Sequence, residues 1–141
     1  MEAIIHYMWR INPEVAISQF IKSNIAISVS DSLGRIIYAN NRFCSITGRK
    51  ENELLGVVNS LFASKDHKDP FYKNLWKTIE SGSLWKGIIN NKTKSGELFC
   101  LDTTIVPIKD NGGNIESYVA MYIDVSETNF DYNESGHREY A

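Results

Sequence analysis

The residue best suited to meeting a ligand is Asn91, which lies in an apolar stretch over residues 84–93 that is typical of a strand. Because side chains alternate across a strand, Trp85, Gly87, Ile89 and Asn91 share one face, so a core position for the apolar members implies one for Asn91. A buried amide without a partner costs about 1–3 kcal/mol, so Asn91 needs a backbone partner or the polar edge of a ligand. A flat heteroaromatic ring meets that need, since its body packs on apolar residues while its amide edge pairs with Asn91. The alternative is that Asn91 ends the strand and helps to form the following turn.

Residue patterns for catalysis and metal binding are absent from the sequence. The histidines are His6, His67 and His137, and no two of them lie close together in the chain. Cys44 and Cys100 form no Cys-x-x-Cys pair, which zinc clusters and thioredoxin-type redox sites require. The nucleophile-elbow, Walker, dinucleotide-glycine and His-Glu-x-x-His motifs are also missing. We therefore predict a protein that is not an enzyme and holds no metal cluster.

His67 is the histidine with the most distinctive surroundings, a charged segment over residues 65–70 that precedes a predicted helix. Three interpretations are open: a surface-loop residue, a contact to a cofactor, or an axial ligand to haem. Haem would need such a ligand, and His67 is the one histidine that the sequence places suitably.

The overall composition is that of one folded domain. The chain has 141 residues, of which 43% are hydrophobic and 23% charged, and its net charge is -2. That charge argues against a basic nucleic-acid binder. No stretch approaches the ~20 apolar residues that cross a bilayer, and the N-terminus lacks the apolar run of a secretory signal. With only two cysteines, we predict a cytoplasmic protein with no nucleic-acid partner and no membrane insertion.

The elements that must position Asn91 form a regular series. Residues 26–30 and 35–39 predict a hairpin around a turn at residues 31–34. Asn40 is suited to begin a short helix that Gly48 ends, and residues 51–55 predict a further helical turn.

The second half of the chain predicts one longer helix and three strands. The helix begins at Pro70, and its apolar residues recur at helical spacing until Gly82. The strands are residues 84–93, 98–108 and 115–125, separated by tight turns, which is typical of an antiparallel meander. The predicted fold is therefore α+β, a five-stranded antiparallel sheet with short helices on one face.

The two ends of the chain differ from this centre. Residues 1–24 predict a helical cap, because apolar residues recur at helical spacing on both sides of a start signal at Asn12 and Pro13. This cap either packs on the domain's own sheet or pairs with a second copy. After Val125 the chain turns polar with little apolar periodicity, which indicates a loosely held tail.

Taken in order, fragments from both halves of the chain resemble a PAS domain. The resemblance covers about residues 23–128. It divides the chain into the cap at 1–24, a PAS domain at 25–128 and a tail at 129–141. The fragments are residues 26–31, 34–40, Phe43, 46–48, 53–56, Leu75, Trp76, Gly82, 85–87, Asn91, 94–96, 104–108, Asp110, Gly113 and 124–126.

Within that family, the Trp85-x-Gly87 motif and Asn91 resemble the FAD-binding PAS domains of aerotaxis receptors and of the nitrogen-fixation redox regulator. Light-oxygen-voltage domains also place a flavin-contacting Asn at Asn91. However, Asn59 occupies the position of their photoreactive Cys, and Leu101 that of their second flavin Asn. A cysteinyl-flavin light switch is therefore not expected.

The resemblance implies a sensor that binds FAD, responds to redox state or oxygen, and passes a conformational signal to a partner or output domain. It implies that Asn91 and Asn59 hydrogen-bond the flavin ring edge, that Trp85 lines the ring pocket, that Ser28 offers a polar contact, and that His67 lies near the phosphate or adenine end. The alternatives are a cofactor-free module that forms a homodimer through its N-terminal helices, and a haem or small-acid sensor.

Overall fold

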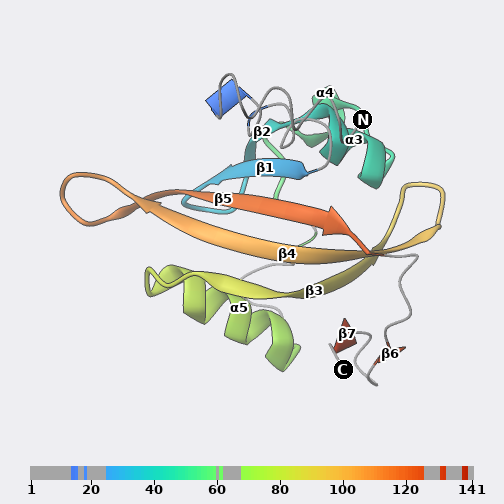
Figure 1. Ribbon diagram of the computed structural model, residues 1–141. Coiled ribbons are helices and arrows are strands. Elements are labelled where there is room, and N and C mark those ends of the chain that lie inside the picture. The colour runs from blue at the N-terminus through green and yellow to red at the C-terminus, as the bar shows by residue number, and fades with distance from the viewer. Residues whose placement is uncertain are drawn as a thin grey trace.

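The computed structural model describes residues 14, 15, 18, 25–59, 61, 68–125, 131, 132, 138 and 139. Its centre is an antiparallel sheet of five strands in the order β2-β1-β5-β4-β3 (Figure 1), which confirms the predicted fold class. The strands are β1 (Ala26–Asp31), β2 (Ile36–Ala39), β3 (Trp85–Lys92), β4 (Leu98–Lys109) and β5 (Ile115–Asp124). The helices are α3 (Asn41–Thr47), α4 (Glu51–Leu54) and α5 (Pro70–Glu80).

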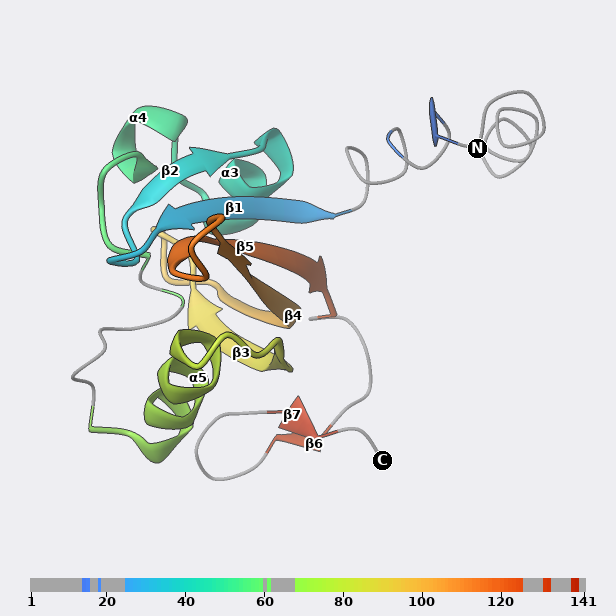
Figure 2. The same cartoon turned by 90° about the vertical axis from the view of Figure 1, so that its left-hand side faces the viewer.

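The helices gather on one face of the sheet, and Figure 2 shows α4 and α5 on the same side of the strands. Aromatic side chains join helix to sheet beneath them. The rings of Phe43 in α3 and Tyr122 in β5 lie 5.2 Å apart, and those of Trp76 in α5 and Tyr118 in β5 lie 5.8 Å apart. Such ring pairs add stability beyond the area that they bury. They hold α3 and α5 against the same central strand.

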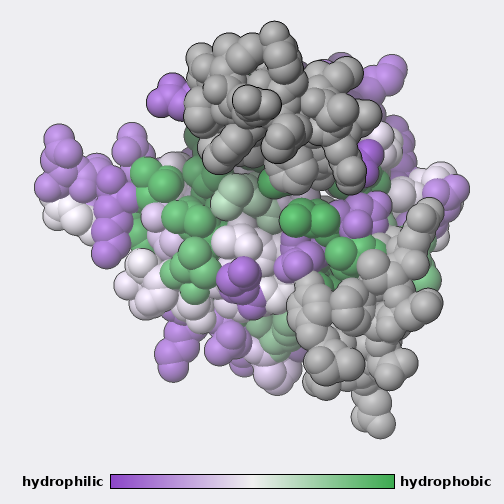
Figure 3. Space-filling view, viewed as in Figure 1, coloured by the Kyte–Doolittle hydropathy of each residue, from purple (hydrophilic) through white to green (hydrophobic). Residues whose placement is uncertain are grey.

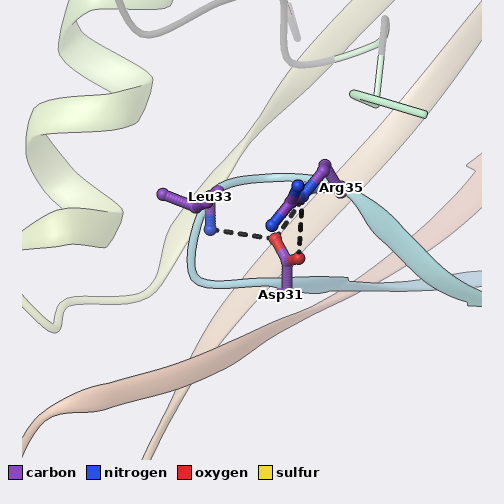
Figure 4. A network of polar contacts seen from close by, with 3 residues as sticks. All are labelled: Asp31, Leu33 and Arg35. Atoms are coloured by element: carbon purple, nitrogen blue, oxygen red, sulfur yellow. Dashed lines mark hydrogen bonds and ion pairs between the residues drawn. The ribbon is translucent and has the colours of Figure 1, made fainter. Parts of the chain in front are cut away.

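The turn between β1 and β2 is organised by Asp31 (Figure 4). Its Oδ1 accepts hydrogen bonds from the backbone N–H groups of Leu33 at 2.9 Å and Arg35 at 3.0 Å, and Arg35 Nε donates to Oδ2 at 3.1 Å. Burial raises the pKa of Asp31, but the hydrogen bonds from Arg35 and Leu33 together outweigh it, so the pKa lies below its ordinary value. An ionised carboxylate therefore stabilises the predicted hairpin at neutral pH.

Local capping signals begin and end the helices, as the sequence predicts. Asn40 Oδ1 accepts hydrogen bonds from the N–H groups of Phe43 at 2.9 Å and Ile27 at 3.0 Å. One side chain therefore starts α3 and ties it to β1. Gly48 ends α3 in the left-handed region, with φ 71° and ψ 22°, and Asp69 caps the start of α5.

The two faces of the sheet differ in how well they are covered. The outer face leaves apolar side chains in solvent: Ile123 is 48% exposed, Ile108 39% and Tyr38 50%. Figure 3 shows hydrophobic residues grouped on the face turned toward the viewer in Figure 1. The inner face, under the helices, carries the buried residues Ala26, Ser28, Leu101, Thr103, Ile105, Tyr118, Ala120 and Tyr122.

The two ends of the chain are described only in part. The predicted N-terminal cap lies outside the described residues, apart from Glu14, Val15 and Ser18. In the tail, β6 (Asp131–Tyr132) pairs with β7 (Arg138–Glu139), and β7 contacts β3. The polar pattern did not predict this pairing, because a strand of two residues is too short to show alternation.

Candidate functional site

A cavity of about 340 Å³ lies between the α3–α4 corner and the adjoining ends of β3 and β4. Its volume falls in the range of small-molecule sites, roughly 300–1,000 Å³. The inner wall consists of the buried residues Ile36, Phe43, Thr47, Leu54, Asn59, Leu61 and Phe99, with half-buried Asn91 beside them. The lining residues that reach solvent, here called the mouth, are Arg49, Glu53, Val57, Val58 and Lys92. A largely apolar wall with a few polar groups is the usual composition of a ligand pocket.

Asn91 lines this cavity from the end of β3, where it pairs with Phe99 of β4. Its Oδ1 accepts a hydrogen bond from the backbone N–H of Lys92 at 2.8 Å. Its Nδ2 has no hydrogen-bond partner among the described residues. The contact to the Lys92 N–H agrees with a role of Asn91 at the strand end, whereas its contact to a ligand stays a prediction.

Asn59 belongs to a buried polar cluster with Ser28 of β1 and Tyr122 of β5. Asn59 Nδ2 donates to Ser28 Oγ and to Tyr122 Oη, each at 3.3 Å, and the two hydroxyl oxygens lie 2.9 Å apart. Asn59 Oδ1 accepts from the backbone N–H of Leu61 at 3.1 Å. The three side chains are at most 1% exposed. Through Asn59, the cluster joins the cavity wall to two strands of the sheet.

The buried polar cluster is electrically neutral. Complete burial raises the pKa of the Tyr122 hydroxyl, and the hydrogen bonds from Ser28 and Asn59 offset only part of that rise. The hydroxyl therefore stays protonated across the physiological range. It works as a neutral donor and acceptor and not as an acid or base.

Trp85 stands at the other end of β3 from Asn91 and does not belong to the residues that line this cavity. Its ring is 7% exposed, packs edge-on against Phe71 with centroids 5.5 Å apart, and covers Gly87. His67 lies outside the described residues. The structure thus places Asn59 and Asn91 at the wall of one cavity, with Ser28 bonded to Asn59. The ligand contacts expected of all five residues stay predictions.

Tyr122 is the member of this site that the sequence reasoning missed. The signal was present in the strand predicted over residues 115–125, where Tyr118, Ala120 and Tyr122 alternate on the inner face. A hydroxyl that enters the core needs a partner, which the polar residues Ser28 and Asn59 provide.

Glu53, at the mouth, forms an ion pair with Lys94 of the β3–β4 turn, which does not line the cavity, and their Oε2 and Nζ atoms lie 2.6 Å apart. The hydrogen bond from Lys94 lowers the pKa of Glu53, with a further contribution from the Lys50 N–H. No group of three or more histidine, cysteine or acidic residues within the described part of the chain could hold a metal ion. Among the same residues, no helix is both long and apolar enough to cross a membrane.

Comparison with known proteins identifies the family. The nitrogen fixation regulatory protein of Klebsiella oxytoca is 32% identical over 125 residues, which cover 89% of this chain and 25% of that protein. The aerotaxis receptor of Escherichia coli K12 is 26% identical over 95 residues, which cover 67% of this chain and 19% of the receptor. This chain therefore spans a quarter or less of the length of these relatives.

The comparison with solved structures agrees with the sequence comparison. The dark structure of the blue-light photoreceptor Aureochrome1 LOV superposes with a TM-score of 0.64 at 26% identity, covering 80% of this chain and 83% of that one. Residues 24–127 match the family described as PAS domain, and this range includes every strand of the main sheet and the helices α3, α4 and α5. The chain belongs to the PAS domain family.

Proposed function

We propose that this PAS domain binds a flavin, FAD in the first place, and acts as a redox or oxygen sensor that signals to a partner or output domain. The observation that carries the proposal is the amide nitrogen of Asn91, which has no hydrogen-bond partner among the described residues and lies at the wall of a cavity of about 340 Å³. A polar donor in such a place needs a ligand acceptor or water to offset its desolvation. The resemblance to aerotaxis and nitrogen-fixation sensors supplies the choice of flavin.

The residues present fit a flat ring with a polar edge. Phe43, Leu54 and Phe99 offer apolar surface to the faces of such a ring, while Asn91 Nδ2 offers a donor to a carbonyl on its edge. When bound, a flavin supplies a reversible redox change coupled to protonation of its ring. Asn91 would hold the ring edge and respond to that change by altering its hydrogen bonds.

The buried polar cluster offers a route from the cavity to the sheet. Asn59 Nδ2 donates to the hydroxyl oxygens of Ser28 and Tyr122. A ligand that turned the Asn59 amide toward itself would weaken these contacts. Because Ser28 lies in β1 and Tyr122 in β5, a change in hydrogen bonding at the cavity wall reaches the two strands at the centre of the sheet.

Absorption spectroscopy on the purified protein, before and after incubation with FAD or FMN, tests the proposal. We expect the absorption bands of oxidised flavin, and on binding either a red shift of these bands or quenching of the flavin fluorescence. Asn91→Leu should weaken binding about tenfold, which is the value of one hydrogen bond of about 1.4 kcal/mol. Asn90→Leu is the matched control, because Asn90 lies next in the chain but faces away from the cavity.

Three outcomes would count against the proposal. A protein with no flavin bands after incubation would refute flavin binding, and a Soret band lost in His67→Ala would indicate haem instead. Equal weakening by Asn90→Leu and Asn91→Leu would mean that the donor at the cavity plays no special part.

A second function, a cofactor-free homodimer module, is favoured by the exposed apolar side chains of Ile123 and Ile108 on the outer face of the sheet. In this alternative the N-terminal helices predicted over residues 1–24 form the contact. Light scattering at high concentration would show a dimer, and deletion of residues 1–12 would abolish it. For either function we propose a cytoplasmic location, where cysteines that form no disulfide, such as Cys44 and Cys100, stay reduced.

A further inference from the structure

The β3–β4 turn, residues 93–97, lies against the corner between α3 and α4, although the two are far apart in the sequence (Figure 1). The backbone N–H of Lys94 donates to the carbonyl oxygen of Thr47, the last residue of α3, at 3.4 Å. Gly48 follows Thr47, and a Cβ placed on it would lie 3.7 Å from Thr93 Cβ. The turn therefore packs against the end of α3 at van der Waals distance.

An ion pair spans the same junction. Glu53 Oε2 lies 2.6 Å from Lys94 Nζ, while Glu53 Oε1 accepts from the backbone N–H of Lys50 at 3.1 Å. One oxygen of the carboxylate is thus fixed to the start of its own helix and the other to the turn. The hydrogen bond from Lys94 is the main cause that lowers the pKa of Glu53, and the charge of Arg49 adds a smaller part. The two contacts of Lys94, to Thr47 and to Glu53, are here called the clasp.

The clasp connects two walls of the cavity at its mouth. Thr47 and Glu53 line the cavity from the α3–α4 corner, whereas Asn91 and Lys92 line it from the end of β3. Lys94 itself does not line the cavity. Movement of the turn away from the corner would therefore part the two walls and widen the mouth.

The turn is held more firmly to itself than to the corner. Within it, the N–H of Thr93 donates to the carbonyl oxygen of Glu97 at 2.8 Å, and the N–H of Gly96 to that of Thr93 at 3.0 Å. The 3.4 Å bond to Thr47 is long beside the usual N–H···O distance of about 2.7–3.2 Å. The side chains of the ion pair are 58% and 30% exposed, and pairs that open to solvent are weak. The turn can therefore leave the corner as one unit at low cost.

We infer that the clasp is a gate, whose opening sets the rate at which a ligand enters and leaves the cavity but not how tightly the ligand binds. The inference rests on the proposed function for the ligand, a flavin, and adds control over the exchange of that ligand. Because Lys94 does not line the cavity, its contacts change between the open and closed mouth and not between the empty and loaded cavity. Weakening the clasp therefore raises the entry and exit rates by the same factor.

Stopped-flow mixing with FAD, followed by quenching of the flavin fluorescence, tests the gate. Lys94→Gln should raise the association and dissociation rate constants together by about two- to fivefold, the range that an exposed ion pair supports, while Kd changes by less than about twofold. Loss of a cation by itself would slow the association of the anionic FAD, so faster association cannot arise from charge attraction. In the protein without flavin, hydrogen exchange at the backbone N–H of position 94 should rise by a similar factor.

Matched variants separate the gate from a general effect of charge. Lys86→Gln removes an exposed cation of β3 that does not line the cavity, and it should leave both rate constants unchanged. Lys94→Arg keeps the ion pair and should keep the slow exchange. In a Glu53→Gln background, Lys94→Gln should have no further effect, because the partner of Lys94 is already gone. Circular dichroism checks that each variant is folded.

The outcomes distinguish this inference from the proposed function. If FAD binds and Lys94→Gln leaves both rate constants unchanged, the gate is overturned and flavin sensing stands. A rise in the dissociation rate alone, with weaker binding, would overturn the gate as well, because Lys94 would then support the loaded state. Unchanged hydrogen exchange at position 94 would contradict the opening of the clasp. If FAD does not bind to the unaltered protein, the proposed function fails and the inference falls with it.

Discussion

Replacing Tyr122 by Phe would measure what the buried polar cluster contributes to the fold. The substitution keeps the ring, with its contact to Phe43 at 5.2 Å, and removes the hydroxyl. That hydroxyl takes part in hydrogen bonds with Ser28 Oγ at 2.9 Å and Asn59 Nδ2 at 3.3 Å. Each such bond contributes about 0.5–1.5 kcal/mol net, and Ser28 and Asn59 can still pair with each other. We therefore expect a loss of about 1–2 kcal/mol in the free energy of unfolding.

Urea unfolding followed by tryptophan fluorescence measures this difference directly. The midpoint should fall with an unchanged slope, and the melting temperature should drop by roughly 5 °C. Tyr38→Phe is the matched control, because Tyr38 is 50% exposed and a surface change of this kind costs less than about 0.5 kcal/mol. If Tyr122→Phe were as stable as Tyr38→Phe, the hydroxyl would not be part of a buried hydrogen-bonded cluster.

Two further predictions concern the sheet and its first turn. Gly87→Ala should destabilise the protein by about 1–3 kcal/mol, because a Cβ at Gly87 would lie 2.6 Å from Trp85 Cη2. Gly112→Ala is the control in the same urea assay and should change stability little, because a Cβ there meets nothing closer than 3.4 Å. Asp31 has a lowered pKa in the folded state, so its contribution is complete above the ordinary value of 3.8 and is lost as the pH falls through the folded value. Urea midpoints across this range should therefore show the advantage of the unaltered protein over Asp31→Asn shrinking on acidification, and a constant difference would contradict the reasoning.

Elements that depend on local signals could be predicted from the sequence. Asn40, Gly48 and Pro70 act through hydrogen bonds or backbone angles within a few residues of themselves, so their effect is visible in a short window of the chain. The turn at Asp31 is of the same kind, since its partners lie two and four residues away. The order of helices and strands followed from these signals.

The bonding at the site could not be predicted in the same way, because its contacts join distant parts of the chain. Asn59 bonds Ser28 across 31 residues and Tyr122 across 63. Side-chain alternation placed Trp85 and Asn91 on the same face of β3. It did not show that the two residues lie too far apart along the strand to line one cavity. Six residues of strand span about 20 Å, which is longer than a cavity of this volume extends in most shapes. The mouth depends in turn on a contact between the end of α3 and the β3–β4 turn, which no sequence pattern expresses.

Polar groups around the cavity fall into two kinds, and together they restrict the ligand. Those of the inner wall are neutral, the amides of Asn59 and Asn91, whereas the charged side chains of Arg49, Glu53 and Lys92 reach solvent at the mouth. Burying an ionised group without a counter-charge is costly, so a small organic acid held against the inner wall would lack the cation that it needs among the described residues there. A ligand that keeps its charge at the opening and presents a neutral polar edge inside avoids this cost. The distribution of charge around the cavity therefore favours a phosphorylated heteroaromatic compound over a small acid.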